Sequence, residues 1–316
     1  MIFSANTVLP LFIVMFAGFA ARKAGLIDGR AVSAINTLVF YMCVSCMMFQ
    51  NTAGIRFTDF FDIGFILYAM LTTLGVFLAA LAYSALFIKE SPSVGSFIQG
   101  SFRGNFAYIG VPLITAMMGD SRSVKMAVVV AFVVPLYNVL SITILTLKSD
   151  KIADKRFSGV FVRTVLLNIV KNPLIIGIAL GLAFSLLNLS LPGALDKSVT
   201  YLSQMAAPAA LLCVGANIDL KSIKNRINYL IPAALLKCVI PPAVFIPLAL
   251  LLGMNREAII VLFVLYSTPT AAASYVMADA MGCDGTLAAN IIAVTTLLSL
   301  FTFTGGIFLL RTFGII

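Results

Sequence analysis

Histidine and tryptophan are absent from this 316-residue chain, and only 12 of its residues are acidic. Without histidine, the chain lacks the commonest general base and the commonest protein ligand of metal ions. Its five cysteines lie in or beside apolar segments without the spacing of a disulfide framework, and we interpret the Cys43–Cys46 pair as two buried thiols. An enzyme inside a membrane would need a nucleophile with its base, paired aspartates or a metal cluster. We therefore expect no catalytic residue, no metal and no cofactor.

Charged residues of both signs are scarce. They make up 10% of the chain, against 61% for hydrophobic residues, and the mean hydropathy is +1.08. This composition predicts an all-α polytopic membrane protein. Ten apolar runs approach the roughly 20 residues that a bilayer crossing needs. They cover residues 4–21, 33–50, 60–88, 94–118, 124–147, 172–189, 198–217, 227–252, 257–281 and 286–310. The first run has no positively charged start and reaches Arg22 and Lys23 only at its end, so we expect a retained helix rather than a cleaved signal.

The lysines and arginines of the short loops predict the orientation. Thirteen of them fall on one side of the predicted helices and six on the other, and the richer side is expected to be cytoplasmic. Both termini would then lie on the non-cytoplasmic side of the cell inner (plasma) membrane. The net charge of +9 mostly reflects this asymmetry. We expect the basic linker 148–171 to face anionic lipid, with no nucleic acid bound.

The chain also aligns with itself. A shift of 163 positions pairs Pro10 with Pro173, and further identities continue as far as Gly119 and Gly282. This register divides the chain into two five-helix repeats, 1–147 and 172–316, joined by the linker 148–171. Because five is odd, the second repeat enters the membrane from the opposite side. Such inverted repeats are typical of secondary transporters, in which the substrate site forms near the midplane between broken helices.

The fourth apolar run of each half contains helix-breaking residues. Residues 101–113 read SFRGNFAYIGVPL, and residues 264–276 read VLYSTPTAAASYV. We predict helix breaks at Gly104, Pro112 and Pro269, because glycine weakens a helix and proline removes a backbone donor. Irregular backbone at membrane depth is tolerated only inside protein or beside a wet cavity. We therefore expect the fourth and ninth helices to be broken and to cross.

These two segments predict an anion site. Half-helix N-termini that meet each contribute roughly half a positive charge. A guanidinium at mid-membrane costs about 2.5–3.5 kcal/mol on the lenient scale and is normally kept for a partner or a cavity, and its fork of donors suits a carboxylate. An alternative role for this arginine is a bond to a backbone carbonyl, or snorkelling from a tilted helix. The expected substrate-binding residues are Arg103, Asn105, Tyr108, Gly110, Ser267, Thr268, Thr270 and Ser274.

Few other ionisable residues fall within the predicted helices. Lys237 lies inside the eighth run and Asp279 near the end of the ninth. Both are candidate coupling groups, although Asp279 is also placed to be merely interfacial. Because the chain has no histidine, proton coupling would fall to these two residues, to Asp62 or to the substrate itself.

Four stretches of the chain are similar to a known family. They are NFAYIGVPLITAMMGD from Asn105, NPLIIGIALGLAFSLLNLSLPG from Asn172, PAALLCVGANIDL from Pro208, and PTAAASYVMADAMGCDGTLAANIIAVTTLLSL from Pro269. In this order they resemble the auxin efflux carrier family, which includes bacterial permeases assigned to malonate and plant auxin exporters. The resemblance implies five-plus-five inverted repeats, as in sodium/proton antiporters and bile-acid transporters. It also implies a dimerising scaffold of helices 1, 2, 6 and 7, and a mobile transport domain of helices 3–5 and 8–10.

The sequence departs from the family pattern at the expected crossing. Plant members place a proline-asparagine pair in each broken helix, whereas this chain has Gly104-Asn105 and Pro269-Thr270. The plant substrate is therefore not carried over. Family members also commonly have a proline where this chain has Ser45, and we expect its absence to straighten helix two.

The leading hypothesis is a secondary active transporter of a small organic anion that works by elevator-type alternating access. The substrate would be a mono- or dicarboxylate such as malonate, or an auxin-like aromatic acid. A sodium or proton antiporter of the same fold would need acidic residues at the midplane, and the two broken segments contain none. A non-transporting membrane sensor would have no use for two aligned helix breaks. The expected partners are the anion, the lipid bilayer and a second copy of the chain.

Overall fold

The computed structural model describes residues 2–53, 62–118, 125–126, 129–149, 170–218 and 220–315. Within these ranges the regular structure is helical, and the one β-type contact is an isolated bridge between Gly104 and Thr270. The first half contains α1 (Ile2–Lys23), α2 (Gly29–Leu38), η1 (Val39–Val44), α3 (Ser45–Ala53), α4 (Ile63–Phe87), α5 (Ser91–Phe102), η3 (Phe106–Gly110), α6 (Val111–Met118), η4 (Val129–Val133) and α8 (Val134–Lys148). The second half contains α10 (Pro173–Leu186), α11 (Gly193–Ala216), α12 (Leu220–Asn225), α13 (Ile227–Cys238), α14 (Ile240–Leu251), α15 (Arg256–Ser267), α16 (Ala273–Ala280) and α17 (Gly285–Thr312). Most of the predicted linker 148–171 lies outside the described residues.

Six helical stretches of the described chain are long and apolar enough to cross a membrane. They are Gly29–Ala53, Ile63–Phe87, Ala131–Lys148, Gly193–Ala216, Ile227–Leu251 and Gly285–Thr312. Their outer faces carry large apolar side chains, such as Leu67, Leu71 and Leu78 of α4, each more than half exposed. A surface of this kind suits contact with lipid rather than water. The predicted class, an all-helical polytopic membrane protein, agrees with this structure.

Polar side chains mark the starts of several helices. Asp28, Asp62 and Asp284 each accept a hydrogen bond from the backbone N–H three residues later, at 2.7, 3.0 and 2.9 Å. Asn172 and Asn255 cap α10 and α15 in a similar way. Such caps satisfy donors that the first helical turn leaves without an intrahelical partner. In the part of the chain that the structure describes, three aspartates therefore serve as helix caps.

One group of helices comprises α1, α2, η1, α3, α10 and α11, in which α1 packs on α11 and α3 packs on both α10 and α11. Glycines allow the closest approach. A Cβ at Gly18 of α1 would lie 2.1 Å from the carbonyl oxygen of Leu212, and one at Gly215 of α11 would lie 1.8 Å from that of Met15. Small residues at helix contacts are the usual way in which membrane helices gain packing contacts. The backbones of α1 and α11 are therefore in direct contact at these two glycines.

Gly215→Leu is expected to separate α1 from α11 and to destabilise the protein. The new side chain would occupy the position of the Met15 carbonyl, and overpacking of this kind typically costs about 1–3 kcal/mol or more. A lower melting temperature of the detergent-purified protein would show the effect. The matched control is Gly305→Leu in α17, where an added Cβ meets no atom within 4 Å. Equal melting temperatures for the two variants would contradict this account of the α1–α11 contact.

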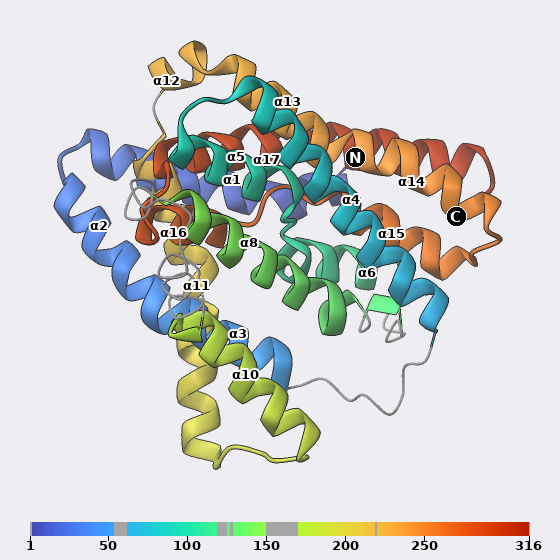
Figure 1. Cartoon of the computed structure of the whole chain (residues 1–316), viewed down its shortest axis with the longest axis horizontal. Coiled ribbons are helices and arrows are strands. Elements are labelled where there is room, and N and C mark those ends of the chain that lie inside the picture. Colours follow the sequence, from blue (N-terminus) through green and yellow to red (C-terminus); the bar gives the residue numbers. More distant parts are fainter. Residues whose placement is uncertain are drawn as a thin grey trace, which may run out of the picture.

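A second group is arranged around α5, which packs against α4, α8, α13 and α17, while α15 packs on α14 and α16 on α17. In Figure 1, α3 and α10 lie at the bottom of the view, well separated from α14 and α15 at the right. The two groups meet where α16 contacts α2, η1 and α11, and where α17 contacts α1 and α11. The first of these contacts brings α16 next to helices that lie far from it in sequence.

Two helices are less regular than the sequence predicted. Helix two runs without a gap from Gly29 to Ala53, as α2, η1 and α3. Its turns are not uniform, because the π-helical η1 directly precedes Ser45, whose hydroxyl donates to the carbonyl of Phe40 at 3.2 Å. The predicted run 227–252 also bends at Val239, between α13 and α14. Pro241, which has no N–H for the carbonyl of Lys237, follows this bend.

Candidate functional site: two crossed helix breaks

The breaks in the fourth and ninth predicted helices lie side by side. The backbone is extended at Arg103, just after α5, and at Thr268, just after α15. The N–H of Asn105 donates to the carbonyl of Pro269 at 2.8 Å, and the N–H of Ala271 donates to that of Arg103 at 3.1 Å. These two bonds form the antiparallel bridge and satisfy backbone groups freed by the breaks.

Local chemistry explains why the chain leaves the helix at these points. A residue before proline is disfavoured in the helical region, and Thr268 before Pro269 accordingly has ψ of 139°. At Gly104, a Cβ would lie 2.6 Å from the hydroxyl oxygen of Thr268, so a side chain there would obstruct the crossing. Thr270 holds the pair together, because its hydroxyl donates to the carbonyl of Gly100 at 2.6 Å.

A small cavity of about 40 Å³ opens beside the crossing. Its lining consists of Met47, Met48 and Asn51 of α3, Arg103, Gly104, Asn105 and Phe106, Val134, Tyr137 and Asn138 of α8, Ala206 and Ala207 of α11, and Ala271, Ala272 and Ala273. Both half-helix starts therefore contribute to its wall. A volume of this order holds at most a few water molecules.

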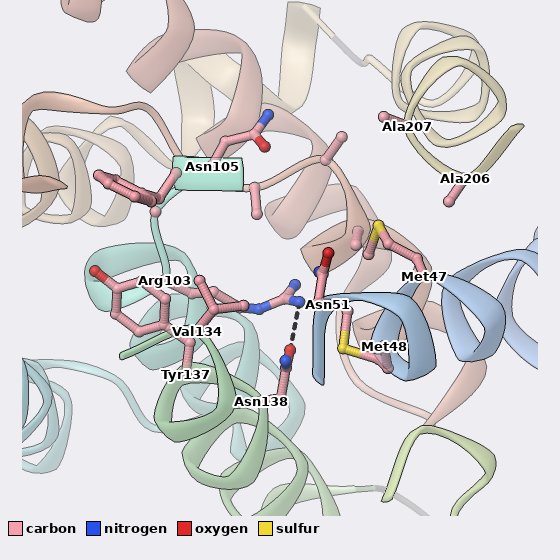
Figure 2. A pocket seen from close by; sticks show the side chains of 15 residues that line it. Met47, Met48, Asn51, Arg103, Asn105, Val134, Tyr137, Asn138, Ala206 and Ala207 are labelled. Atoms are coloured by element: carbon pink, nitrogen blue, oxygen red, sulfur yellow. Dashed lines mark hydrogen bonds between the residues drawn. The ribbon is translucent and has the colours of Figure 1, made fainter. Parts of the chain in front are cut away.

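Arg103 is the cationic group of this cavity. Its side chain is 4% exposed, and its guanidinium donates to the side-chain oxygens of Asn138 at 2.8 Å and Ser274 at 3.3 Å. Figure 2 shows the guanidinium pointing toward Asn51 and Asn138. Among the described residues, the ion pairs are Lys125–Asp62 and Arg226–Asp284, so Arg103 forms none with a described carboxylate. The Asn138 and Ser274 contacts orient the charge without neutralising it.

The remaining predicted substrate-binding residues have varied positions. Asn105 lines the cavity, although its amide points away from the guanidinium of Arg103 in Figure 2. Ser274 orients Arg103. Thr268, whose hydroxyl donates to the carbonyl of Leu265 at 3.0 Å, and Thr270 support the breaks. None of Ser267, Thr268, Thr270, Ser274 and Gly110 is part of the cavity lining.

Gly110 and Pro112 both lie on the C-terminal side of the first break, Gly110 at the end of η3 and Pro112 in α6. A Cβ at Gly110 would lie 2.7 Å from the ring of Phe106, so this glycine makes room for packing. Pro112 is the second residue of α6 and directly follows the π-helical η3, whereas the chain leaves the helix at residues 103–105. A proline inside a continuous helical segment disturbs the turn before it, because its missing N–H removes one backbone hydrogen bond, and η3 is such an irregular turn. The side chains of Tyr108 and Pro112 lie outside the described part of the structure.

The candidate coupling residues are widely separated. Lys237 is 2% exposed, and its Nζ donates to the carbonyl of Tyr266 at 3.0 Å, close to the crossing. Asp279 lies near the end of α16, where it accepts a hydrogen bond from the amide of Asn36 in α2 at 2.7 Å. Asp62 caps α4 and forms the ion pair with Lys125. Of the three, Lys237 lies beside the crossing itself, whereas Asp279 lies at the far end of α16, the second half of the broken ninth helix.

Sequence reasoning missed several residues of the cavity. Asn138 of α8 is the best hydrogen-bond partner of Arg103, and Asn51, Met47, Ala206 and others form the opposite wall. A single asparagine inside an otherwise apolar run was the available signal for Asn138. The methionines and alanines carry no such signal, because their residue types are ordinary in membrane helices.

These observations define a class: an all-helical membrane protein with two interrupted helices crossing beside a buried cation, as found in secondary carriers. The chain belongs to the membrane transport protein family, also known as the auxin efflux carrier family, which it matches over residues 3–307. The resemblance proposed from its sequence motifs is therefore confirmed. Membership, together with the apolar helices, identifies a multi-pass membrane transporter.

Two curated relatives are similar along almost their whole length. A protein of Rhizobium meliloti (strain 1021), described as a candidate malonate transporter, is 29% identical over 313 residues, which cover 96% of this chain and 95% of the relative. An uncharacterized transporter of Methanocaldococcus jannaschii is 24% identical over 302 residues, covering 93% of this chain and 95% of the relative.

Proposed function

We propose that this chain is a secondary active transporter of a small organic anion bound at the crossing of its broken helices. The carrying observation is Arg103, a cation on the cavity wall that is 4% exposed and bonded to neutral side chains. A buried charge without a counter-charge is costly. A carboxylate entering the cavity would supply that counter-charge and match the donor fork of the guanidinium.

The start of α16 adds to the attraction for an anion. Ala271, Ala272 and Ala273 line the cavity, and α16 begins at the last of these. The first turn of a helix presents N–H groups without intrahelical partners and carries roughly half a positive charge. Together with Arg103, this helix end makes the cavity electropositive.

The opposite wall suits the remainder of a small acid. Met47, Met48, Ala206 and Ala207 are apolar, and Asn51 is the polar residue among them. A mono- or dicarboxylate with a short carbon chain fits this division, and the Rhizobium relative makes malonate the first compound to test. An auxin-like aromatic acid is the larger alternative. Because the cavity has only about 40 Å³, the substrate would enter in a more open conformation.

An inverted repeat is the architecture that we propose for this transporter. The 25-residue stretches Ile63–Phe87 and Ile227–Leu251 are displaced by 164 positions, whereas α5 and α15, of 12 residues each, are displaced by 165. Both displacements lie within two positions of the predicted register of 163, which is the precision of helix boundaries. The paired backbone bonds at the crossing support a two-fold relation, since each break donates one bond and accepts one.

We further propose that the group around α5 moves as a transport domain along the group formed by α1, α2, α3, α10 and α11. The contact between them includes Asn36–Asp279 and a hydrogen bond at 2.6 Å from the amide of Asn217 to the hydroxyl of Tyr275. In this proposal, Asp279 lies at the interface along which the two groups of helices move. We also propose that two copies of the chain form a homodimer through the first group. Both termini would lie on the non-cytoplasmic side of the cell inner membrane.

Ligand-dependent thermal stabilisation of the detergent-purified protein tests the proposal. A ligand that binds the folded state raises its stability by about 2.7 kcal/mol at 100 times its Kd. We expect malonate or another small carboxylate to raise the melting temperature, and sodium chloride, neutral amides and cationic amines not to do so. A rise with sodium alone would favour the antiporter alternative. A rise with none of the carboxylates at concentrations up to tens of millimolar would contradict the proposed function.

A further inference from the structure

A second cation lies close to the crossing, apart from the anion cavity. Nζ of Lys237 donates to the carbonyl of Tyr266 at 3.0 Å, and a Cβ built on Gly104 would lie 3.3 Å from this nitrogen. Lys237 borders a separate cavity of about 10 Å³, together with Ser101 and Phe102 at the end of α5 and Tyr266 near the end of α15. The ammonium group thus lies where two half-helices finish.

The ends of α5 and α15 give this position its electrostatic character. Both helices have 12 residues, and both finish at the crossing with an extended residue, Arg103 or Thr268, after the last turn. A helix C-terminus carries roughly half a negative charge and leaves carbonyl groups without intrahelical donors. Two such ends together amount to about one negative charge. One ammonium group balances that charge.

Lys237 has no described carboxylate that would otherwise explain its burial. The ion pairs among the described residues are Lys125–Asp62 and Arg226–Asp284, both away from the crossing. The bend at Val239 ends α13 and leaves Lys237 in its last turn. In transporters with broken helices, unwound carbonyls and half-helix C-termini form the site of a coupling cation.

We propose that the ammonium group of Lys237 occupies the cation position of the crossing, so that the protein binds no sodium or other alkali cation there. The inference deepens the proposed function, because it assigns the coupling-cation position of the same crossing. The carrier would then work without sodium. This proposal concerns cation binding at Lys237, whereas anion binding at Arg103 is tested by the carboxylate experiment described above.

Replacing Lys237 by methionine distinguishes a lysine that balances the charge of the two helix ends from a lysine that is buried only by packing. A lysine buried only by packing is a desolvated charge, and its replacement by an apolar side chain of similar length would leave stability unchanged or raise it. A lysine that balances two helix ends stabilises the crossing, and its loss leaves the Tyr266 carbonyl and both helix ends without a cation. The two explanations predict effects of opposite sign.

The experiment compares melting temperatures of the purified full-length protein in sodium chloride and in choline chloride at equal ionic strength, without any carboxylate. We expect the parent to melt at the same temperature in both salts, Lys237→Met to melt about 5 °C lower, and Lys237→Arg to stay near the parent. Lys237→Ala, which leaves space, should regain part of its loss in sodium and not in choline. Lys224→Met, which removes an exposed lysine of α12, is the matched control and should behave like the parent.

Three results would overturn the proposal: a sodium-specific rise in the parent, a Lys237→Met variant at least as stable as the parent, or no sodium-specific recovery in Lys237→Ala. If Lys237→Met does not accumulate, accumulation of Lys237→Arg supports a requirement for charge. Accumulation of Lys237→Gln with loss of Lys237→Arg contradicts it. Because no carboxylate is present, these outcomes are independent of whether the anion binds at Arg103.

Discussion

Arg103→Gln is expected to abolish saturable carboxylate binding and uptake while leaving the protein folded. Loss of one partner of a buried, hydrogen-bonded charge pair typically costs about 2–5 kcal/mol, or roughly 30- to 5,000-fold in affinity. The fold is expected to survive, because the substitution removes a buried charge that has no described carboxylate partner. Uptake of labelled malonate into proteoliposomes and ligand-induced thermal stabilisation both measure the loss.

Two further variants make this test specific. Arg103→Lys keeps the charge but not the planar fork, so we expect intermediate affinity. Arg311→Gln removes an exposed arginine from the last turn of α17 and should leave binding unchanged. Carboxylate affinity of the Arg103→Gln variant equal to that of the parent would show that Arg103 plays a purely structural part through Asn138 and Ser274.

Gly104→Ala is expected to slow substrate exchange at least about tenfold. The added methyl group would lie 2.6 Å from the hydroxyl oxygen of Thr268 and 3.1 Å from Cε of Lys237. Overpacking at such a contact costs about 1–3 kcal/mol, and here it would force apart the two backbone hydrogen bonds of the crossing. Counterflow of labelled carboxylate in proteoliposomes measures the exchange rate.

A second substitution should relieve the first. Thr268→Ala removes the hydroxyl that meets the new methyl group, so the double variant is expected to recover much of the exchange rate lost in Gly104→Ala. Gly305→Ala, in a position with no neighbour within 4 Å, serves as the control. Failure of the double variant to recover, with both proteins folded, would mean that Gly104 matters for a reason other than its contact with Thr268.

Much of the crossing was predictable because its chemistry is local. A proline that removes a backbone donor, a glycine that weakens a helix and an arginine inside an apolar run each have physical consequences that depend on few neighbours. Gly104, Pro269 and Arg103 were identified on those grounds.

The rest of the site depended on tertiary structure. Asn138 becomes a partner of Arg103 only because α8 packs on α5, and Met47 and Ala206 reach the cavity only through the packing of α3 and α11. The form of the irregularity near Pro112 also depended on the structure: a proline predicts a disturbed helical turn, but not that the disturbance is the π-helical η3.

The two walls of the anion cavity differ in how freely they can change during evolution. On one side, Arg103, Asn138 and Ser274 depend on one another for hydrogen bonds, so replacing any of them leaves a buried polar group without its partner. On the other side, Met47, Met48, Ala206 and Ala207 present apolar surface. Changes of size there alter the shape of the cavity without creating an unsatisfied polar group. Under the proposed function, substitutions in α3 and α11 would change which acid the cavity accepts, while Arg103 would still bind the carboxylate group.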